Sequence, residues 1–154
     1  EGPIDGASEA LRTIKRMYRS ERIRQTYGLK QGNSSDSIVK AILYLDEHMA
    51  EGPHSDDVAR RVGLSRGHFS SLFHRVTGSS FISFLSGRRL STAQYYLRNT
   101  EVKPMDIPPK IGISDYKYFS KWFKKETGMT PTQFRMESSG KLNEASSQAK
   151  PLTK

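Results

Sequence analysis

The sequence predicts an all-α fold with two helix-turn-helix subdomains joined by a long linker helix. Apolar residues recur at helical spacing along most of the 154 residues, and no strand pattern of useful length is present. Two segments about fifty residues apart also repeat each other, each with a glycine turn followed by an aromatic helix. The repeat pairs Gly63, Phe69, Phe73, Gly78 and Phe84 with Gly112, Phe119, Phe123, Gly128 and Phe134.

Composition narrows the class of protein and of partner. The formal net charge is +9, which favours an anionic partner, most often nucleic acid. There is no cysteine, so disulfides and thiolate metal sites are excluded. No run of about 20 apolar residues could span a membrane, and the N-terminus has no apolar signal segment.

Residues 1–34 read as an N-terminal linker. Residues 1–7 are expected to be flexible, and a helix is expected over 8–27, where Leu11, Ile14 and Tyr18 share a stripe among arginines. Two interpretations stay open for this helix. It is a linker helix or dimer contact, or it is a solvated, partly frayed helix.

The first helix-turn-helix subdomain is expected over residues 35–79. An opening helix has apolar residues from Ile38 to Met49, and Ser55 is expected to cap a short second helix. Gly63 then supplies a turn at positive φ. Ser65 caps the third helix, whose buried stripe is Phe69, Leu72, Phe73 and Val76 and which ends at Gly78.

The remaining elements follow the same logic. A linker helix is expected over 80–99, about 30 Å long, and a second subdomain over 100–137. That subdomain contains a short segment at 105–111, a helix from Ser114 to about Thr127, and a last short helix capped by Thr130. Residues 138–154 are polar and small and are expected to form a disordered tail.

Each repeat separates a buried stripe from a polar outer face, as a helix in the DNA major groove requires. Small residues such as Gly67, Ser70 and Ser71 permit close approach, and Arg66, Lys117 and Lys121 can reach guanine or phosphate. The helix N-termini at Ser80 and Thr130 can hold a phosphate. The linker is close to the roughly 34 Å of one DNA turn, so one chain could read two adjacent major grooves.

Residues 35–137 resemble the DNA-binding domain of AraC/XylS-type transcription regulators. One motif is Phe81-x-x-Phe84-Leu85-x-x-x-Arg89-Leu90-x-x-Ala93-x-x-Tyr96-Leu97. The other is Gly112-Ile113-Ser114-Asp115-x-x-Tyr118-Phe119-Ser120-x-x-Phe123-Lys124-Lys125-x-x-Gly128-x-Thr130-Pro131-x-x-x-Arg135. The resemblance implies seven helices, promoter binding to double-stranded DNA, and a cytoplasmic protein of the bacterial nucleoid.

The resemblance also implies which residues meet DNA. Base contacts would come from the two recognition helices, at Arg66, Gly67, Ser70, Ser71, Tyr116, Lys117, Ser120 and Lys121. Phosphate contacts would involve Ser80, Arg89, Lys124 and Thr130. A structural role for Arg89 inside the linker-helix junction is the alternative, and Pro131 and Arg135 are expected to be structural.

The chain departs from the family pattern in the second bracing helix. Ile107-Pro108-Pro109 replaces the usual Ile-Ala, and proline costs about 3 kcal/mol inside a helix. That helix is expected to start late, around Pro108, or to be distorted. We therefore predict that the second subdomain is the less stable or less DNA-competent half.

The sequence disfavours two other classes of function. An enzyme is disfavoured because the four histidines, His48, His54, His68 and His74, form no metal-binding pair and no phosphate loop is present. A helical protein-interaction module is disfavoured because the outer faces are polar. No cofactor and no metal are expected. RNA polymerase, and a sensor or receiver domain in the same protein or on a separate chain, are the further partners considered, and no membrane is expected.

Overall fold

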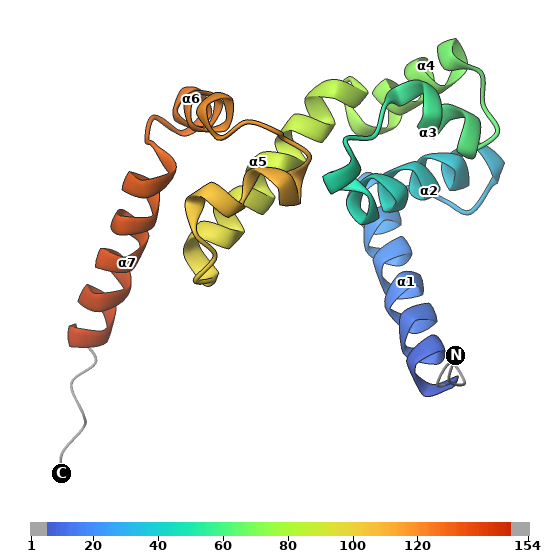
Figure 1. Cartoon of the computed structure of the whole chain (residues 1–154). Coiled ribbons are helices and arrows are strands. Elements are labelled where there is room, and N and C mark those ends of the chain that lie inside the picture. The colour runs from blue at the N-terminus through green and yellow to red at the C-terminus, as the bar shows by residue number, and fades with distance from the viewer. Residues whose placement is uncertain (1–5, 149–154) are drawn as a thin grey trace, which may run out of the picture. The chain divides into compact units, whose positions relative to one another are not determined.

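The computed structural model describes residues 6–148, with the side chains of residues 7, 33 and 141–148 left aside. Within this part of the chain every regular element is helical, as predicted (Figure 1). The α-helices are α1 Gly6–Tyr27, α2 Asn33–Glu47, α3 Ser55–Arg61, α4 Arg66–Thr77, α5 Phe81–Asn99, α6 Tyr116–Thr127 and α7 Pro131–Gln148. The 3-10 helices are η1 Met49–Glu51, η2 Pro104–Asp106 and η3 Pro108–Ile111.

The helices pack into two compact units. Unit 1 comprises the chain up to His48 together with Pro53–Leu85, and unit 2 comprises Met49–Gly52 together with the chain from Ser86 onward. The division falls inside α5, so the predicted linker helix contributes a part to each unit. The segment Met49–Gly52, expected in the first subdomain, packs with unit 2 instead.

The core of unit 1 is built by α2, α3 and α4. Ile38, Ile42 and Leu45 on α2 are fully buried, and so is Val58 on α3. Phe69 and Phe73 of α4 are buried against Phe81, at ring-centroid distances of 5.9 and 5.6 Å. The apolar spacing in the sequence therefore identified the buried faces of these helices.

The core of unit 2 is centred on α6. Phe119 and Phe123 are fully buried, together with Ile107 and Ile111 of the segment before the turn. Ala93 and Leu97 bury the inner side of α5, and Phe134 of α7 is 8% exposed. Unit 2 thus repeats the plan of unit 1, a recognition helix held by aromatic rings.

The second brace is not an α-helix. η2 and η3 are separated at Ile107, and Pro108 and Pro109 open η3. The distortion expected from the two prolines is therefore present, because proline has no N–H for an i→i−4 bond and suits the first turn of a helix.

Two helix starts differ from the sequence expectation. Ser55 is the first residue of α3 rather than its cap, and His54 holds the N-cap position without a side-chain bond. Helix α6 begins at Tyr116 rather than at Ser114, and Asp115 caps it. One helix thus starts one residue before the expected position and the other two residues after it, since backbone geometry, rather than cap preference alone, places the first turn.

The tail expectation was wrong over residues 138–148. Helix α7 continues to Gln148, so the last helix is long rather than short. The Ser138 hydroxyl donates to the Phe134 carbonyl at 2.8 Å within this helix. A polar composition predicts that these residues are exposed, but it does not prevent them from extending a helix that has already started at a capped N-terminus. Residues 149–154 lie outside the described part of the chain.

Candidate nucleic-acid interface

The recognition helices α4 and α6 have the same length and the same C-terminal construction. Each has 12 residues and ends at a glycine in the left-handed region, Gly78 at φ 77° and Gly128 at φ 81°. The Thr77 hydroxyl donates to the Phe73 carbonyl at 2.8 Å and accepts from the Ser79 amide at 3.3 Å. Thr127 makes the corresponding bonds at the same two distances.

Paired phenylalanine rings anchor both helices. Phe73 meets Phe84 edge to face at 5.2 Å and 88°, and Phe123 meets Phe134 at 5.3 Å and 87°. Such aromatic pairs contribute about 0.5–1.5 kcal/mol beyond their buried area. The inner faces are therefore fixed in the same way, which leaves the outer faces to differ freely.

The turns before the two helices differ by one residue. The first residue of α4 follows Gly63 by three positions, and the first residue of α6 follows Gly112 by four. When the helices are aligned at their C-terminal glycines, Gly78 and Gly128, Lys117 corresponds to Gly67 and Lys121 corresponds to Ser71. The outer face of α6 is consequently the more basic of the two.

In unit 1 the predicted base-contact residues share one exposed surface. Arg66, Gly67, Ser70 and Ser71 are all exposed on α4. Arg66 does not extend freely, because its Nε lies 3.2 Å from Oδ1 of Asp56 on α3. Sequence reasoning missed this acidic partner, which the turn brings within reach of the recognition helix and which no periodic signal marks.

In unit 2 the four predicted residues fall into two pairs. Lys117 and Lys121 are exposed on α6, whereas Tyr116 and Ser120 are half-buried. The Tyr116 ring lies 6.0 Å from Phe119, so it continues the aromatic core toward the start of the helix. Asp115 caps this helix by accepting from the Lys117 and Tyr118 amides at 3.0 and 3.3 Å.

The predicted phosphate sites at helix starts are capped. Ser80 Oγ accepts from the Ser83 amide at 3.2 Å, and Thr130 Oγ1 accepts from the Gln133 amide at 3.2 Å. The Gln133 side-chain oxygen in turn accepts from the Thr130 amide at 3.0 Å, which completes a capping box. Ser80 is exposed and Thr130 is half-buried, while Lys124 is exposed on α6.

Arg89 is engaged inside unit 2. Its Nε donates to the Ile111 carbonyl at 2.8 Å and its Nη2 to the Gly112 carbonyl at 3.3 Å. Burial lowers the pKa of the guanidinium from its ordinary value, although an arginine stays charged at any physiological pH. Arg89 therefore holds the carbonyls at the end of η3 and in the glycine turn.

Arg135 has a comparable role at the end of α5. Its guanidinium donates to the carbonyls of Leu97, Tyr96 and Thr100 at 3.1, 3.0 and 3.1 Å. The last carbonyls of a helix lack some of their partners within it, so this side chain supplies a donor to Leu97 and joins the Thr100 amide as a donor to Tyr96. The geometry agrees with the structural role expected for Arg135.

Gly112, in the turn between η3 and α6, makes the closest backbone contact of this second turn. Its φ is +76°, and a Cβ built there would overlap the Met49 carbonyl oxygen and lie 3.2 Å from the Gly52 amide nitrogen. Gly63, its equivalent in unit 1, has φ +74° and nothing within 4 Å of such a Cβ. The second turn thus packs against η1, and the first turn has no such neighbour.

The described residues offer little for other chemistry. No group of three or more His, Cys, Asp or Glu in that part of the chain could hold a metal ion. His48 stacks on Tyr44 at 4.1 Å and its Nδ1 lies 3.0 Å from the Tyr44 carbonyl oxygen, which is a packing role. Within residues 6–148 we find no helix with the length and apolar content to cross a bilayer.

Comparison with known proteins agrees with this geometry. A family model described as a helix-turn-helix domain matches residues 58–137. The arabinose operon regulatory protein of Escherichia coli (strain K12) is 32% identical over 108 residues, which cover 70% of this chain and 37% of that protein. The chain therefore spans little more than a third of the length of this relative.

Two further matches extend over nearly the whole of the other chain. Regulatory protein SoxS of Salmonella typhimurium is 30% identical over 103 residues, covering 66% of this chain and 96% of that protein. The crystal structure of an AraC-type DNA-binding regulator from Chromobacterium violaceum has a TM-score of 0.62 at 25% identity, covering 68% of this chain and 94% of that one. The chain thus belongs to the AraC-type family of helix-turn-helix transcription regulators, and it is a sequence-specific DNA-binding domain.

Proposed function

We propose that α4 and α6 each enter a major groove of the same duplex and read two adjacent segments. The matched construction of the two helices carries this proposal, because equal lengths, equal C-terminal glycine caps and equal aromatic anchors present two outer faces in the same way. The length of α5 supports it as well. Its 19 residues correspond to about 28 Å, of the order of one DNA turn.

The base contacts we propose are those carried by the outer faces. Arg66, Lys117 and Lys121 have the chemistry to bind guanine N7 and O6. Gly67, Ser70 and Ser71 allow close approach and can donate or accept at base edges, and Tyr116 and Ser120 would contribute from the half-buried edge of α6. On binding, Arg66 would exchange its bond to Asp56 for one to DNA.

For the phosphates we propose Lys124 and the amides at the starts of α5 and α7, behind Ser80 and Thr130. Helix N-termini attract anions through their unpaired amides and the helix dipole. We assign Arg89 to the structural alternative, because its guanidinium donates to two carbonyls of unit 2. Its contribution to DNA binding would be indirect, through the position of the second turn.

Selection of bound sequences from a random duplex pool tests the proposal. Ser71→Arg should change the preferred bases in one half of the selected site, and Lys121→Ala those in the other half, by about 1–3 kcal/mol of discrimination per base pair. Lys124→Ala should weaken binding to all sequences and reduce the salt slope by about one. Lys40→Ala, an exposed lysine on α2, is the matched control.

The assignment fails if neither recognition-face substitution alters the selected site. It also fails if Lys40→Ala changes sequence preference as much as Lys121→Ala does, because binding would then follow net charge alone. Affinity should fall steeply as salt rises, since phosphate contacts release bound counterions.

Two kinds of partner beyond DNA are proposed as well. The chain matches 37% of the E. coli arabinose operon regulatory protein, so we propose that a sensor or receiver domain, in the same protein or on a separate chain, controls it at promoters in the bacterial nucleoid. RNA polymerase is the further partner proposed for a promoter-bound regulator. Transcription from a selected promoter with purified polymerase, with and without this chain, tests that contact.

A further inference from the structure

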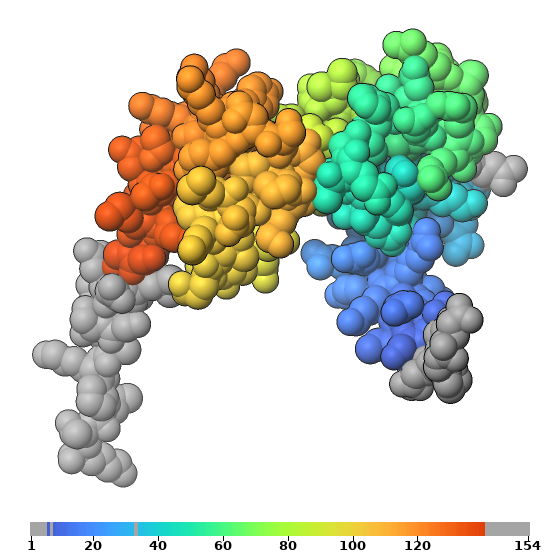
Figure 2. All heavy atoms as spheres, viewed as in Figure 1, coloured from blue at the N-terminus to red at the C-terminus, as the bar shows by residue number. Residues whose placement is uncertain are grey.

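The outer side of α1 carries an apolar stripe that the described residues leave uncovered. Leu11, Ile14 and Tyr18 are 51%, 61% and 66% exposed. Their spacing of three and four residues places them on one side of the helix. In unit 1 the α1 helix, blue in Figures 1 and 2, extends away from α3 and α4.

A different side of α1 attaches the helix to unit 1. Ile23 is only 7% exposed, and the Tyr27 ring lies 6.5 Å from Phe84. Arg24 donates to Asp36 of α2 at 2.7 Å. These contacts belong to the second half of the helix, so the roughly four turns before Ser20 depend on little packing of their own.

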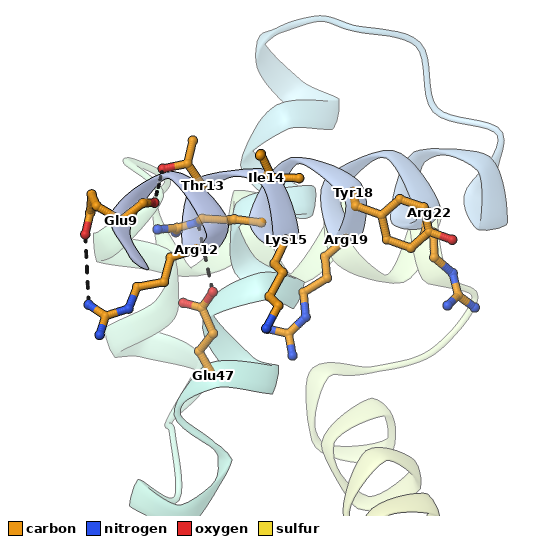
Figure 3. Close-up of a pocket in the computed structure, with 10 residues that line it drawn as sticks. Glu9, Arg12, Thr13, Ile14, Lys15, Tyr18, Arg19, Arg22 and Glu47 are labelled. Carbon is orange, nitrogen blue, oxygen red and sulfur yellow. Dashed lines mark hydrogen bonds and ion pairs between the residues drawn. The ribbon is translucent and has the colours of Figure 1, made fainter. Parts of the chain in front are cut away.

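A row of unpaired cations runs beside the apolar stripe. Lys15, Arg19 and Arg22 fall at i, i+4 and i+7, and none of them forms an ion pair with the described side chains. They line a surface hollow of about 820 Å³, together with Tyr18 and with Glu47 of α2. Figure 3 shows Lys15 and Arg19 extending from the helix in the same direction.

The hollow contains too little acid to neutralise its cations. Arg12 pairs with Glu9 at 3.9 Å and Arg16 with Glu47 at 4.0 Å, which uses both acidic residues of the lining. Like charges at i, i+4 destabilise a helix, and a helical segment with little tertiary packing is marginal in water. The exposed half of α1 therefore lacks both apolar cover and negative charge.

We propose that this outer face of α1, defined by Leu11, Ile14 and Tyr18 with Lys15, Arg19 and Arg22, docks an acidic amphipathic helix of a protein partner. Apolar side chains of that helix, spaced at i, i+3 or i+4 and i+7, would cover the stripe. Flanking Asp or Glu residues would meet the three cations. This proposal is independent of how α4 and α6 read DNA.

Charge complementarity selects this occupant over a second copy of the chain. With Leu11, Ile14 and Tyr18 in the seam of a coiled coil, Lys15 and Arg22 fall at flanking e positions. In a parallel pair they would face Ala10 and Met17 of the second copy, neither of which supplies an acid. DNA would supply negative charge, but its phosphates would leave the apolar stripe exposed.

Fluorescence anisotropy with a designed probe tests the proposal. The probe is a labelled three-heptad peptide with Leu at a and d and Glu at e and g, and the comparison peptide has the same composition in scrambled order. The combined variant Lys15→Glu, Arg19→Glu, Arg22→Glu should bind the probe about tenfold or more weakly, since each lost charge pair costs about twofold. The combined variant Leu11→Ser, Ile14→Ser, Tyr18→Ser should show a similar loss.

Two controls separate docking from net charge and from misfolding. The combined variant Lys30→Glu, Lys103→Glu, Lys125→Glu changes three exposed lysines elsewhere and should bind the probe as the unaltered chain does. The combined variant Lys15→Gln, Arg19→Gln, Arg22→Gln keeps helix-forming side chains and should still bind about fivefold or more weakly. Equal binding of the scrambled peptide, or an equal loss in the Lys30 control, would overturn the proposal.

The alternative occupants give different results. If sedimentation shows that the unaltered chain is a dimer and that the serine variant is a monomer, the stripe is covered by a second copy. If the Lys15, Arg19 and Arg22 variants lose affinity for a random duplex as Lys124→Ala does, the cations bind DNA. Either result would refute the docking of an acidic helix.

Discussion

Replacing Gly112 by alanine tests how tightly the second turn is packed. The substitution forces an L residue into the left-handed region and adds a Cβ against the Met49 carbonyl oxygen, the Arg89 guanidinium and the Gly52 amide. Gly128→Ala is the matched control, because that residue lies in the same unit, has φ +81° and has nothing within 4 Å of its Cβ.

The two substitutions share one cost and differ in the other. An alanine in the left-handed region costs about 1–2 kcal/mol, and the reduced freedom of the unfolded chain offsets part of it equally at both positions. Overpacking against backbone adds about 1–3 kcal/mol at Gly112 alone. We therefore expect Gly112→Ala to destabilise unit 2 by about 2 kcal/mol more than Gly128→Ala does.

Urea unfolding followed by tryptophan fluorescence measures this difference. Trp122 is the one tryptophan of the chain and lies on α6, so its emission reports on unit 2. With a slope of about 1 kcal/mol/M for a unit of this size, the midpoint of Gly112→Ala should lie about 2 M below that of Gly128→Ala. Equal midpoints would show that the turn relaxes without cost and that the contact with η1 does not constrain it.

Three further predictions concern other contacts. Arg135→Ala should lower the stability of unit 2 by about 2 kcal/mol or more in the same assay, because three carbonyls lose a charged donor, and Arg135→Lys should restore only a part. The hydrogen bond from Arg24 lowers the pKa of Asp36, so the stability that this carboxylate contributes is complete above pH 3.8 and is lost as the pH falls through the lowered pKa. The difference in unfolding free energy between the unaltered chain and Asp36→Asn should therefore shrink as the pH falls below 3.8, and a difference that does not change with acid pH would contradict this reasoning. Amide exchange should be faster in η3 than in α3, because a 3-10 segment opened by two prolines has fewer and weaker bonds, and equal protection would refute the predicted weakness of the second subdomain.

The sequence predicted the recognition helices well because their determinants are local. Phe69 and Phe73, and likewise Phe119 and Phe123, sit at the spacing that puts both rings on one face. The positive φ of Gly63 also followed from the local pattern, since a tight turn between two helices requires it. For the same reason the prolines before Gly112 predicted a distorted brace.

The contacts that the sequence did not predict join residues far apart in the chain. Asp56 meets Arg66 across a turn, and Met49 meets Gly112 across sixty-three positions, and neither contact leaves a periodic trace. The positive φ of a tight turn is sufficient to explain a glycine at position 112. The sequence therefore did not indicate that the close contact with Met49 also requires a glycine there. The end of α7 was missed because polar composition predicts exposure rather than backbone conformation.

The difference between the two units lies in how each turn is held rather than in the recognition helices. In unit 1 a regular helix, α3, precedes the turn, and Gly63 has no close neighbour. In unit 2 the prolines remove regular helical bonding, but Arg89 binds the carbonyls of Ile111 and Gly112 and η1 packs against the same turn. Side-chain and tertiary contacts thus replace helix propensity in the second brace. Its position then depends on Arg89 and Gly112, two residues that touch neither base nor phosphate in the binding mode proposed for this domain.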